Sequence, residues 1–396
     1  MSEHFKMIFT TPSGTAENTA KVSGEAIQNV TDFHSGIEGY TVTPLVSLDT
    51  LAEKMGVEKM LVKNESKRFG LNAFKALGGS WAITKYLCEK FGLTPGADTY
   101  SRLTSEEYHE KIKDITFITA TDGNHGRGVA WYAMKLGCKA VVYLPAGSAE
   151  ERVENIRKTG AKAEVTAWNY DDTVRFAEKT AKENGWILVQ DTSWDGYEEI
   201  PLNVMRGYTT LGKEICQQLN EQNIQTPTHV FLQAGVGSMA GAVAGYMTDI
   251  WKEAPPKIII VEPDKADCLY KSAEANNGER CFVTGNMNSM MAGLCCGEPC
   301  PLAWDILKET ASAYISCSDD YSAFAMKLLA KPYAGDPPIV SGESGAVCAG
   351  VAVKLCTDPA LKIYKDKIGI DPSSRILVIS TEGDTCKENY NKIVNG

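Results

Sequence analysis

The sequence predicts an α/β protein built as two open, twisted α/β domains. Short runs of β-branched and apolar residues alternate with longer amphipathic stretches, the pattern of parallel sheets covered by helices on both faces. The chain has 396 residues, 43% of them hydrophobic, enough for a large core in two or more domains. Two glycine-rich segments directly follow expected strands. Since ligands bind at the carboxyl ends of such strands, we expect one in the cleft between the domains.

The strands are expected where β-rich runs are bounded by turn-forming residues. They are residues 60–63, 116–120, 140–144, 163–166, 187–190, 229–233, 258–261 and 376–379. Helices fill the gaps, because apolar residues recur there with a helical period. Clear examples are residues 79–91, 126–136, 149–158 and 170–183.

A break near residues 195–201 divides the chain. We expect residues 85–194 to form a small α/β domain, and residues 1–84 together with 195–396 to form a larger one. The segment 92–114 is rich in charge and lacks a strong apolar period, so a peripheral loop with one surface helix is expected there.

The composition favours small-molecule chemistry. The net charge is -10 and no basic stripe offsets it, which argues against a nucleic-acid partner. No run of about 18 apolar residues occurs and residues 1–22 are polar, so we expect a cytoplasmic protein without a membrane segment. The twelve cysteines are scattered without a C-x-x-C pair, and only five histidines are present. Reduced structural thiols and no metal site are expected.

The first chemical motif is the glycine turn in residues 228–241, THVFLQAGVGSMAG. Gly235 and Gly237 let the backbone approach an anion, Ser238 adds a hydroxyl, and the next helix points N–H groups at the same place. The turn is therefore expected to bind phosphate. Two alternatives stay open. The pattern also fits a dinucleotide fingerprint with Glu262 as the ribose partner, or a tight turn without a ligand.

The second motif is Lys75, in the segment 63–79, KNESKRFGLNAFKALGG. An isolated lysine is ordinarily a solvated surface charge. This one follows a polar turn, starts an expected helix and has apolar neighbours on both sides, so its amine is expected to be partly desolvated. An imine-forming lysine needs such surroundings, whereas a dinucleotide site gives no reason for it.

The third motif is the turn in residues 119–128, TATDGNHGRG. It presents Thr121, Asp122, Asn124 and several backbone donors to one place. Such donors can hold a substrate carboxylate, and the Asn124 amide can hydrogen-bond a phenolic oxygen on a cofactor ring. A helix-capping turn without a ligand explains the same pattern equally well.

Together the three motifs resemble the tryptophan-synthase β family, the fold type II pyridoxal-phosphate enzymes, over nearly the whole chain. That family has a lysine near the amino end, an S/T-S-G-N-H-G turn, a glycine-rich phosphate loop and a carboxy-terminal Ser or Thr facing the pyridine nitrogen. The counterparts here are Lys75, residues 121–126, residues 235–239, and Ser380 or Thr381 in ISTEGDT. The resemblance implies pyridoxal 5'-phosphate as the cofactor, held in the larger domain, and a homodimer.

The resemblance also assigns residues to the two ligands. The expected cofactor contacts are Phe74, Lys75, Asn124, Gly235, Val236, Gly237, Ser238, Met239, Glu343, Ser380 and Thr381. The expected substrate contacts are Thr121, Asp122, Gly123, His125 and Asp191.

Longer segments narrow the resemblance to one branch. Seven segments are similar to the ammonia-lyases of this family that act on 2,3-diaminopropionate: ESKRFGLNAFKALGG, ATDGNHGRGVAW, VQDTSWDGY, LQAGVGSMAG, VEPDKADC, SGESGAV and STEGDT. The branch implies a small amino-acid substrate and an elimination that yields pyruvate and two ammonia molecules. A threonine or serine dehydratase, a cysteine synthase and a dinucleotide-dependent oxidoreductase remain the alternatives.

Three acidic residues carry hypotheses about individual roles. Asp122 stands where most family members have serine, and we hypothesise that Lys75 and Asp122 approach the α-carbon from opposite faces, each serving one enantiomer. Asp191 ends an expected strand, and its charge suits the second ammonium group of the substrate, although a loop-capping Asp looks the same. Glu343 is expected near the cofactor ring, with a solvated turn residue as the alternative.

Overall fold

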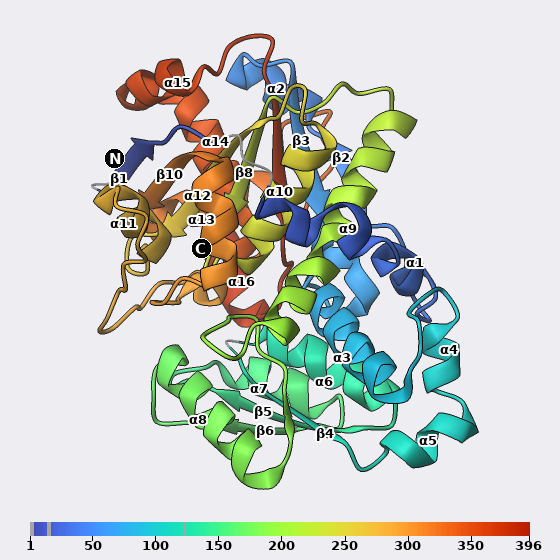
Figure 1. Cartoon of the computed structure of the whole chain (residues 1–396). Helices are drawn as coiled ribbons and strands as arrows, with labels where there is room; N and C mark the ends of the chain where they lie inside the picture. Colours follow the sequence, from blue (N-terminus) through green and yellow to red (C-terminus); the bar gives the residue numbers. More distant parts are fainter. Residues whose placement is uncertain (1–3, 14–16, 122) are drawn as a thin grey trace.

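The computed structural model describes residues 4–13, 17–121 and 123–396, and within them the strands form two sheets, one above the other in Figure 1. The larger sheet has the order β1 (Phe5–Phe9), β10 (Ala311–Cys317), β9 (Lys257–Pro263), β8 (His229–Gln233), β11 (Arg375–Ser380), β3 (Lys59–Asn64) and β2 (Leu45–Ser47). The smaller sheet has the order β6 (Lys162–Val165), β5 (Lys139–Leu144), β4 (Thr116–Ala120) and β7 (Ile187–Leu188).

Parallel pairing dominates both sheets. In the larger one, β10, β9, β8, β11 and β3 are parallel, and only the edge strands β1 and β2 pair antiparallel. The smaller sheet is parallel throughout its described strands. Parallel strands need crossover connections that place helices on the faces, so the predicted α/β class is confirmed.

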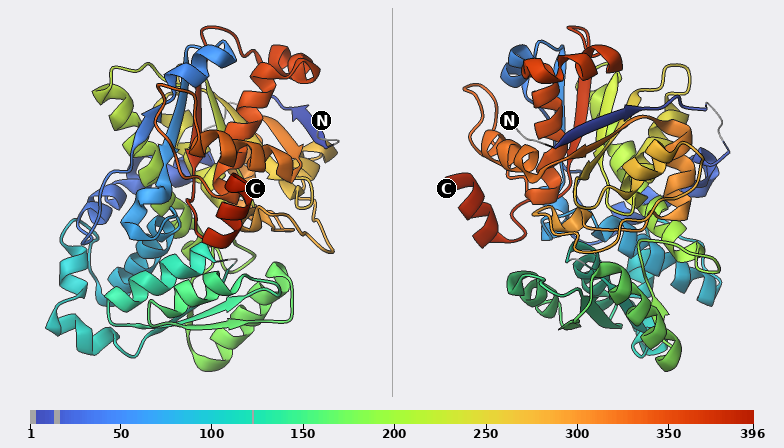
Figure 2. Two further views of the ribbon diagram at one scale, coloured as in Figure 1. Left: turned by 180° about the vertical axis from the view of Figure 1, so that it is seen from behind. Right: turned by 90° about the vertical axis from the view of Figure 1, so that its left-hand side faces the viewer.

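The helices connect the strands and cover the sheets. Those of the first half are α1 (Val30–Ser35), α2 (Asp49–Met55), α3 (Ala76–Phe91), α4 (Thr99–Leu103), α5 (Glu106–Ile112), α6 (Asn124–Lys135), α7 (Glu150–Arg157) and α8 (Tyr170–Asn184). Those of the second half are α9 (Glu199–Glu221), α10 (Ser238–Ile250), α11 (Cys268–Ala275), α12 (Pro301–Thr310), α13 (Asp319–Ala330), α14 (Glu343–Thr357), α15 (Lys362–Ile368) and α16 (Lys387–Asn395). In both views of Figure 2 the smaller sheet and its helices lie at one end of the molecule.

The larger sheet is buried on both faces. Along β8, Val230 and Leu232 pack into a core cluster shared with α3, α9 and α10, while Phe231 between them packs into a second cluster with α2, α13 and α14. Successive side chains of a strand point to opposite faces. Where both faces of a sheet are covered, the middle of each strand therefore consists of consecutive apolar residues, as in Val230, Phe231 and Leu232. That run is what made β8 recognisable in the sequence.

Each strand predicted from the sequence is present, and β4 and β8 match to the residue. The strand predicted at 187–190 ends earlier, at Leu188. Three strands, β1, β2 and β10, were not predicted. The first two are short strands at the edges of the sheet, and serines interrupt the apolar run of β10. The prediction of one helix in segment 92–114 was wrong, because the buried Leu103 and Ile112 anchor two short helices, α4 and α5. The division into domains at residues 85 and 195 stays a prediction.

Two further properties concern the described chain as a whole. No helix among the described residues is long and apolar enough to cross a membrane. All twelve cysteines belong to the described part of the chain, and none of them forms a disulfide there, Cys268, Cys295 and Cys296 included.

Candidate active site

Lys75 lies where the segment after β3 turns into α3, directly before the first residue of that helix. The preceding residue, Phe74, donates its backbone N–H to the Thr381 carbonyl oxygen at 3.1 Å, which ties the lysine segment to the end of β11. The Lys75 side chain is 16% exposed, so its amine is largely desolvated, as the sequence predicts.

The Lys75 ammonium forms a short ion pair with a buried carboxylate. Its Nζ donates to Oδ2 of Asp191 at 2.5 Å, while Oδ1 of Asp191 accepts from the Tyr170 hydroxyl at 3.0 Å. His125 Nδ1 lies 3.8 Å from Asp191 Oδ2. Burial alone would raise the pKa of the Asp191 carboxyl, but His125, Lys75 and the hydrogen bonds outweigh it and hold this pKa well below its usual range. Asp191 is therefore ionised and already binds an ammonium group.

The glycine turn between β8 and α10 lies beside this pair. Gly237 has φ +96°, a left-handed conformation that favours glycine, and a Cβ on Gly235 would lie 3.0 Å from Cys296 Sγ. Ser238 begins α10, and its hydroxyl donates to the Asp191 carbonyl oxygen at 2.5 Å. The open N–H groups at the start of α10 and the close approach that both glycines permit fit a phosphate group.

The turn between β4 and α6 supplies the third side. The Thr121 hydroxyl accepts the backbone N–H groups of Gly123 and Gly126, each at 2.9 Å, so it orders the turn itself. Asn124 Nδ2 donates to Glu382 Oε2, and buried His125 contacts the Val189 carbonyl oxygen through Nε2 at 2.8 Å. Asp122, expected in this turn, lies outside the described residues.

The segment after β11 separates the two candidates for the carboxy-terminal hydroxyl. Thr381 lines the cavity that Lys75 and the glycine turn share, and Ser380 does not. The Ser380 hydroxyl instead donates to Ser341 Oγ at 2.7 Å, beneath the end of the strand.

Glu343 is not among the residues that line this cavity. It begins α14, and its carboxyl lies near Glu382, Arg152 and Asn389. Burial first, and the Glu382 charge second, raise the pKa of the Glu343 carboxyl to about 7.

One cavity brings most of the predicted residues together, along with several that were not predicted. Its lining includes Phe74, Lys75, Asn124, Asp191, the turn Gly235–Met239 and Thr381, and in addition Tyr170, Gln233, Leu294, Cys296, Ser344 and Glu382. Gln233 lies two residues before Gly235 and Glu382 directly follows Thr381, so proximity to the motifs could have found both. No local pattern marks Tyr170, which reaches the cavity from the start of α8.

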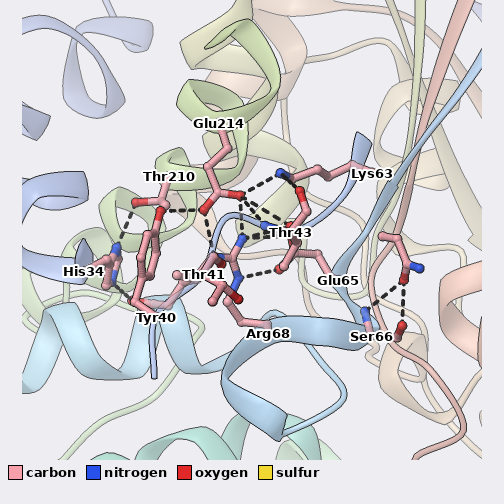
Figure 3. A network of polar contacts seen from close by, with 12 residues as sticks. His34, Tyr40, Thr41, Thr43, Lys63, Glu65, Ser66, Arg68, Thr210 and Glu214 are labelled. Atoms are coloured by element: carbon pink, nitrogen blue, oxygen red, sulfur yellow. Dashed lines mark hydrogen bonds and ion pairs between the residues drawn. The ribbon is translucent and has the colours of Figure 1, made fainter. Parts of the chain in front are cut away.

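A buried network of ion pairs binds the segment that precedes Lys75 to helix α9. Figure 3 shows Glu214 of α9 meeting two cations: Arg68 donates to its two oxygens at 2.7 and 2.8 Å, and Lys63 Nζ donates to Oε2 at 2.6 Å. Arg68 also forms two bonds of 2.9 Å to Glu65. Burial alone would raise the pKa of Glu214, but its bonds to Arg68 and Lys63 lower it to about 2.

The chain between this network and Lys75 is tightly constrained. Phe69 and Asn72 both have left-handed backbones, with φ of 49° and 61°. Asn72 is held at both ends: its carbonyl oxygen accepts the Gly383 N–H at 2.9 Å and its amide donates to Asp384 at 2.8 Å. Non-glycine residues keep such conformations only where the surroundings enforce them.

The dinucleotide alternative does not fit the structure. Glu262, its expected ribose partner, is fully buried and accepts the backbone N–H groups of Leu269 and Tyr270 at 2.9 and 2.6 Å. Each carboxylate oxygen is held by the first turn of α11, and the side chain is not exposed, so a ribose hydroxyl cannot reach it.

A lysine amine, a glycine-rich turn that fits a phosphate and a hydroxyl lie in one cavity at the ends of parallel strands, which is the arrangement of a class of cofactor enzymes. The family model described as "Pyridoxal-phosphate dependent enzyme" matches residues 37–379, and the chain belongs to this family.

Named relatives narrow the class. The chain is 51% identical over 363 residues to diaminopropionate ammonia-lyase of Escherichia coli strain K12, covering 91% of this chain and 89% of the relative. It is 47% identical to diaminopropionate ammonia-lyase of Salmonella typhimurium, covering 96% and 95%. The crystal structure of the selenomethionine-containing holo form of the Escherichia coli enzyme is similar with a TM-score of 0.87 and 45% identity, covering 100% of this chain and 97% of that one.

Proposed function

We propose that this protein is a pyridoxal-phosphate-dependent ammonia-lyase that converts 2,3-diaminopropionate to pyruvate and two ammonia molecules. The observation that carries the proposal is the Lys75–Asp191 ion pair beside the Gly235–Gly237 turn. It joins a cofactor-anchoring amine to an ionised carboxylate suited to a substrate with two ammonium groups. The two ammonia-lyases at 47–51% identity support the same substrate.

The cavity fits pyridoxal phosphate. The Lys75 amine would attach its aldehyde carbon, and the Gly235–Met239 turn, which a Cβ on Gly235 would crowd, would hold its phosphate. Thr381 would face its ring nitrogen. When bound, the cofactor supplies an electron-withdrawing ring that stabilises negative charge on the substrate α-carbon.

The protein's own groups then divide the work. Lys75 Nζ, as a neutral amine, takes the proton from the α-carbon. Asp191, relieved of the Lys75 ammonium, binds the β-ammonium of the substrate through Oδ2, and Tyr170 holds the other carboxylate oxygen in place. The β-ammonium leaves with the electron pair of its carbon–nitrogen bond as the first ammonia. Hydrolysis of the released enamine by water then gives pyruvate and the second ammonia. A second cleft, of about 800 Å³, shares the lining residue Tyr170 with the cofactor cavity.

Three further assignments belong to this proposal and rest on the sequence. Asp122 is proposed to take the α-proton of the enantiomer that Lys75 does not serve, and equal losses on D and L substrates in Asp122→Asn would refute it. Thr121, Gly123 and His125 are proposed to face the substrate. A homodimer is inferred from the family resemblance, and light scattering on the purified protein tests it. A cytoplasmic location is inferred from the sequence, in which no run of about 18 apolar residues occurs and residues 1–22 are polar.

The function is tested by measuring ammonia and pyruvate released from a panel of amino acids. Both enantiomers of 2,3-diaminopropionate should give two ammonia molecules per pyruvate and exceed serine and threonine. A higher kcat/KM for serine or threonine would favour a dehydratase, and sulfide-dependent cysteine formation from O-acetylserine would favour a cysteine synthase. Either result would overturn the proposed substrate.

A further inference from the structure

Gln233, the last residue of β8, belongs to the wall of the cofactor cavity, and its side chain is buried there. Its Nε2 lies 2.9 Å from the Ile379 carbonyl oxygen, 3.0 Å from Thr381 Oγ1 and 3.1 Å from the Ser344 carbonyl oxygen. Its Oε1 lies 3.3 Å from Cys348 Sγ. The residue is 2% exposed, so water does not compete for these contacts.

These neighbours fix the orientation of the amide. Carbonyl oxygens only accept hydrogen bonds, so the amide nitrogen must face Ile379 and Ser344, and the amide oxygen must face the Cys348 thiol. An inverted amide would bring its oxygen against two carbonyl oxygens and leave its nitrogen facing a weak sulfur acceptor. Gln233 is therefore a fixed donor on its Thr381 side.

The fixed donor determines what the Thr381 hydroxyl can do. The Gln233 amide nitrogen donates to Thr381 Oγ1 and cannot accept a hydrogen bond from it, so the hydroxyl is the acceptor in this contact. Its own hydrogen then points away from Gln233. Thr381 lines the cofactor cavity, and its hydroxyl is thereby turned into a donor towards the ligand.

We propose that Gln233 is a positioning residue that holds the Thr381 hydroxyl as a hydrogen-bond donor to the unprotonated ring nitrogen of pyridoxal phosphate. The inference rests on the proposed function, because it concerns the cofactor assigned there. A donor hydroxyl pairs with the lone pair of a neutral pyridine nitrogen, whereas a hydroxyl turned the other way would leave it unpaired. Gln233 thus acts through Thr381 without contacting the reacting atoms.

The test is a double-mutant cycle on the ring nitrogen. Apoprotein of the wild type, Gln233→Met, Thr381→Val and the double variant is titrated with ¹⁵N-labelled pyridoxal phosphate. The dissociation constant and the ¹⁵N chemical shift of the ring are then measured. Each single variant should weaken binding about tenfold and move the ¹⁵N signal towards that of a ring nitrogen without a hydrogen bond. The double variant should match Thr381→Val, because Gln233 acts only through that hydroxyl.

Two matched variants separate positioning from packing. Cys348→Ala disturbs the same core on the oxygen side of Gln233 and should leave the ¹⁵N shift unchanged, while Thr381→Ser keeps the hydroxyl and should restore it. If Gln233→Met fails to fold, Gln233→Asn, which retracts the donor and keeps an amide, takes its place in the cycle.

The contradicting outcomes are distinct. Additive losses, or a ¹⁵N shift that Gln233→Met leaves at the wild-type position, would overturn the positioning role while the lyase assignment stands. A wild-type apoprotein that binds no pyridoxal phosphate would overturn the proposed function, and this inference with it.

Discussion

Lys75 Nζ lies 2.5 Å from Asp191 Oδ2, which joins the start of α3 to the segment that follows β7. The two residues are 116 positions apart in the chain. A single carboxylate therefore holds the amine that is proposed to anchor the cofactor, and it is proposed to receive the second ammonium of the substrate once that amine is engaged. The consequences can be measured one residue at a time.

Asp191→Asn should lower kcat/KM for 2,3-diaminopropionate roughly 100-fold and change the value for serine much less, because only the former has a β-ammonium to pair. Steady-state kinetics on both substrates measure this. The matched control is Asp195→Asn, an exposed carboxylate in the same segment, which should have no effect. A uniform loss on both substrates would argue against ammonium recognition.

The depressed pKa of Asp191 also predicts a pH dependence of stability. The ionised carboxylate contributes fully above its ordinary pKa of 3.8, and this contribution is lost as the pH falls through the lower folded-state value. The difference in unfolding free energy between wild type and Asp191→Asn should be constant above about pH 5 and shrink in strong acid. Urea unfolding across this range tests the sign, and a difference that grows on acidification would contradict it.

Gly237→Ala should weaken pyridoxal-phosphate affinity at least roughly tenfold, because a left-handed backbone costs an L-residue ~1–2 kcal/mol and distorts the phosphate-binding turn. Gly278→Ala is the control: it also has positive φ, +80°, but open space around its Cβ. It should lose stability and retain affinity. Equal dissociation constants for both variants would remove the phosphate-binding role from the turn.

Glu214→Gln should destabilise the fold by about 3 kcal/mol or more, because it leaves the buried Arg68 and Lys63 with one carboxylate between them. Glu221→Gln, at the exposed end of the same helix, should lie within about 0.5 kcal/mol of wild type. Denaturant unfolding compares them. Similar midpoints would mean that the network contributes little to stability.

The raised pKa of Glu343 predicts that its contribution to stability changes with pH in the opposite direction to that of Asp191. The Glu343 pKa is raised to about 7 in the folded protein, so between its ordinary 4.5 and 7 only the unfolded chain loses the proton, and stability falls as the pH rises. Glu343→Gln should remove a decrease on the order of 2 to 3 kcal/mol across this window. Parallel slopes for variant and wild type in urea unfolding would contradict the raised pKa.

The sequence predicts the parts of this site that depend on local pattern. The glycine turn follows the buried strand β8, and Lys75 stands at the start of the buried helix α3. Burial restricts both elements to apolar or small residues, which makes them recognisable in the sequence. Tyr170 was missed because its place in the site arises from contact with Asp191, 21 positions away. Adjacency to the glycine turn could have marked Gln233, but its contact with Thr381, 148 positions away, could not be read from the sequence.

The choice between Ser380 and Thr381 shows the same limit. Successive residues at a strand end point in different directions, and only the packing of Ser341 against Ser380 shows that Thr381 is the one turned to the cavity. Glu343 is expected near the cofactor ring. Its carboxyl lies near Glu382, which lines the cavity, and near Arg152 and Asn389, so a contact with the ring stays a prediction. The sequence shows that this glycine-rich motif contains a charged residue, but it does not show which way the side chain points.

The central claim is that Lys75 carries the cofactor of this lyase. Borohydride reduction of the yellow holoprotein followed by peptide mass spectrometry tests it most directly. The peptide that contains Lys75 should carry the mass of reduced pyridoxal phosphate on its amine, and Lys75→Arg should carry none. A modification on another lysine, or its persistence in Lys75→Arg, would contradict the account.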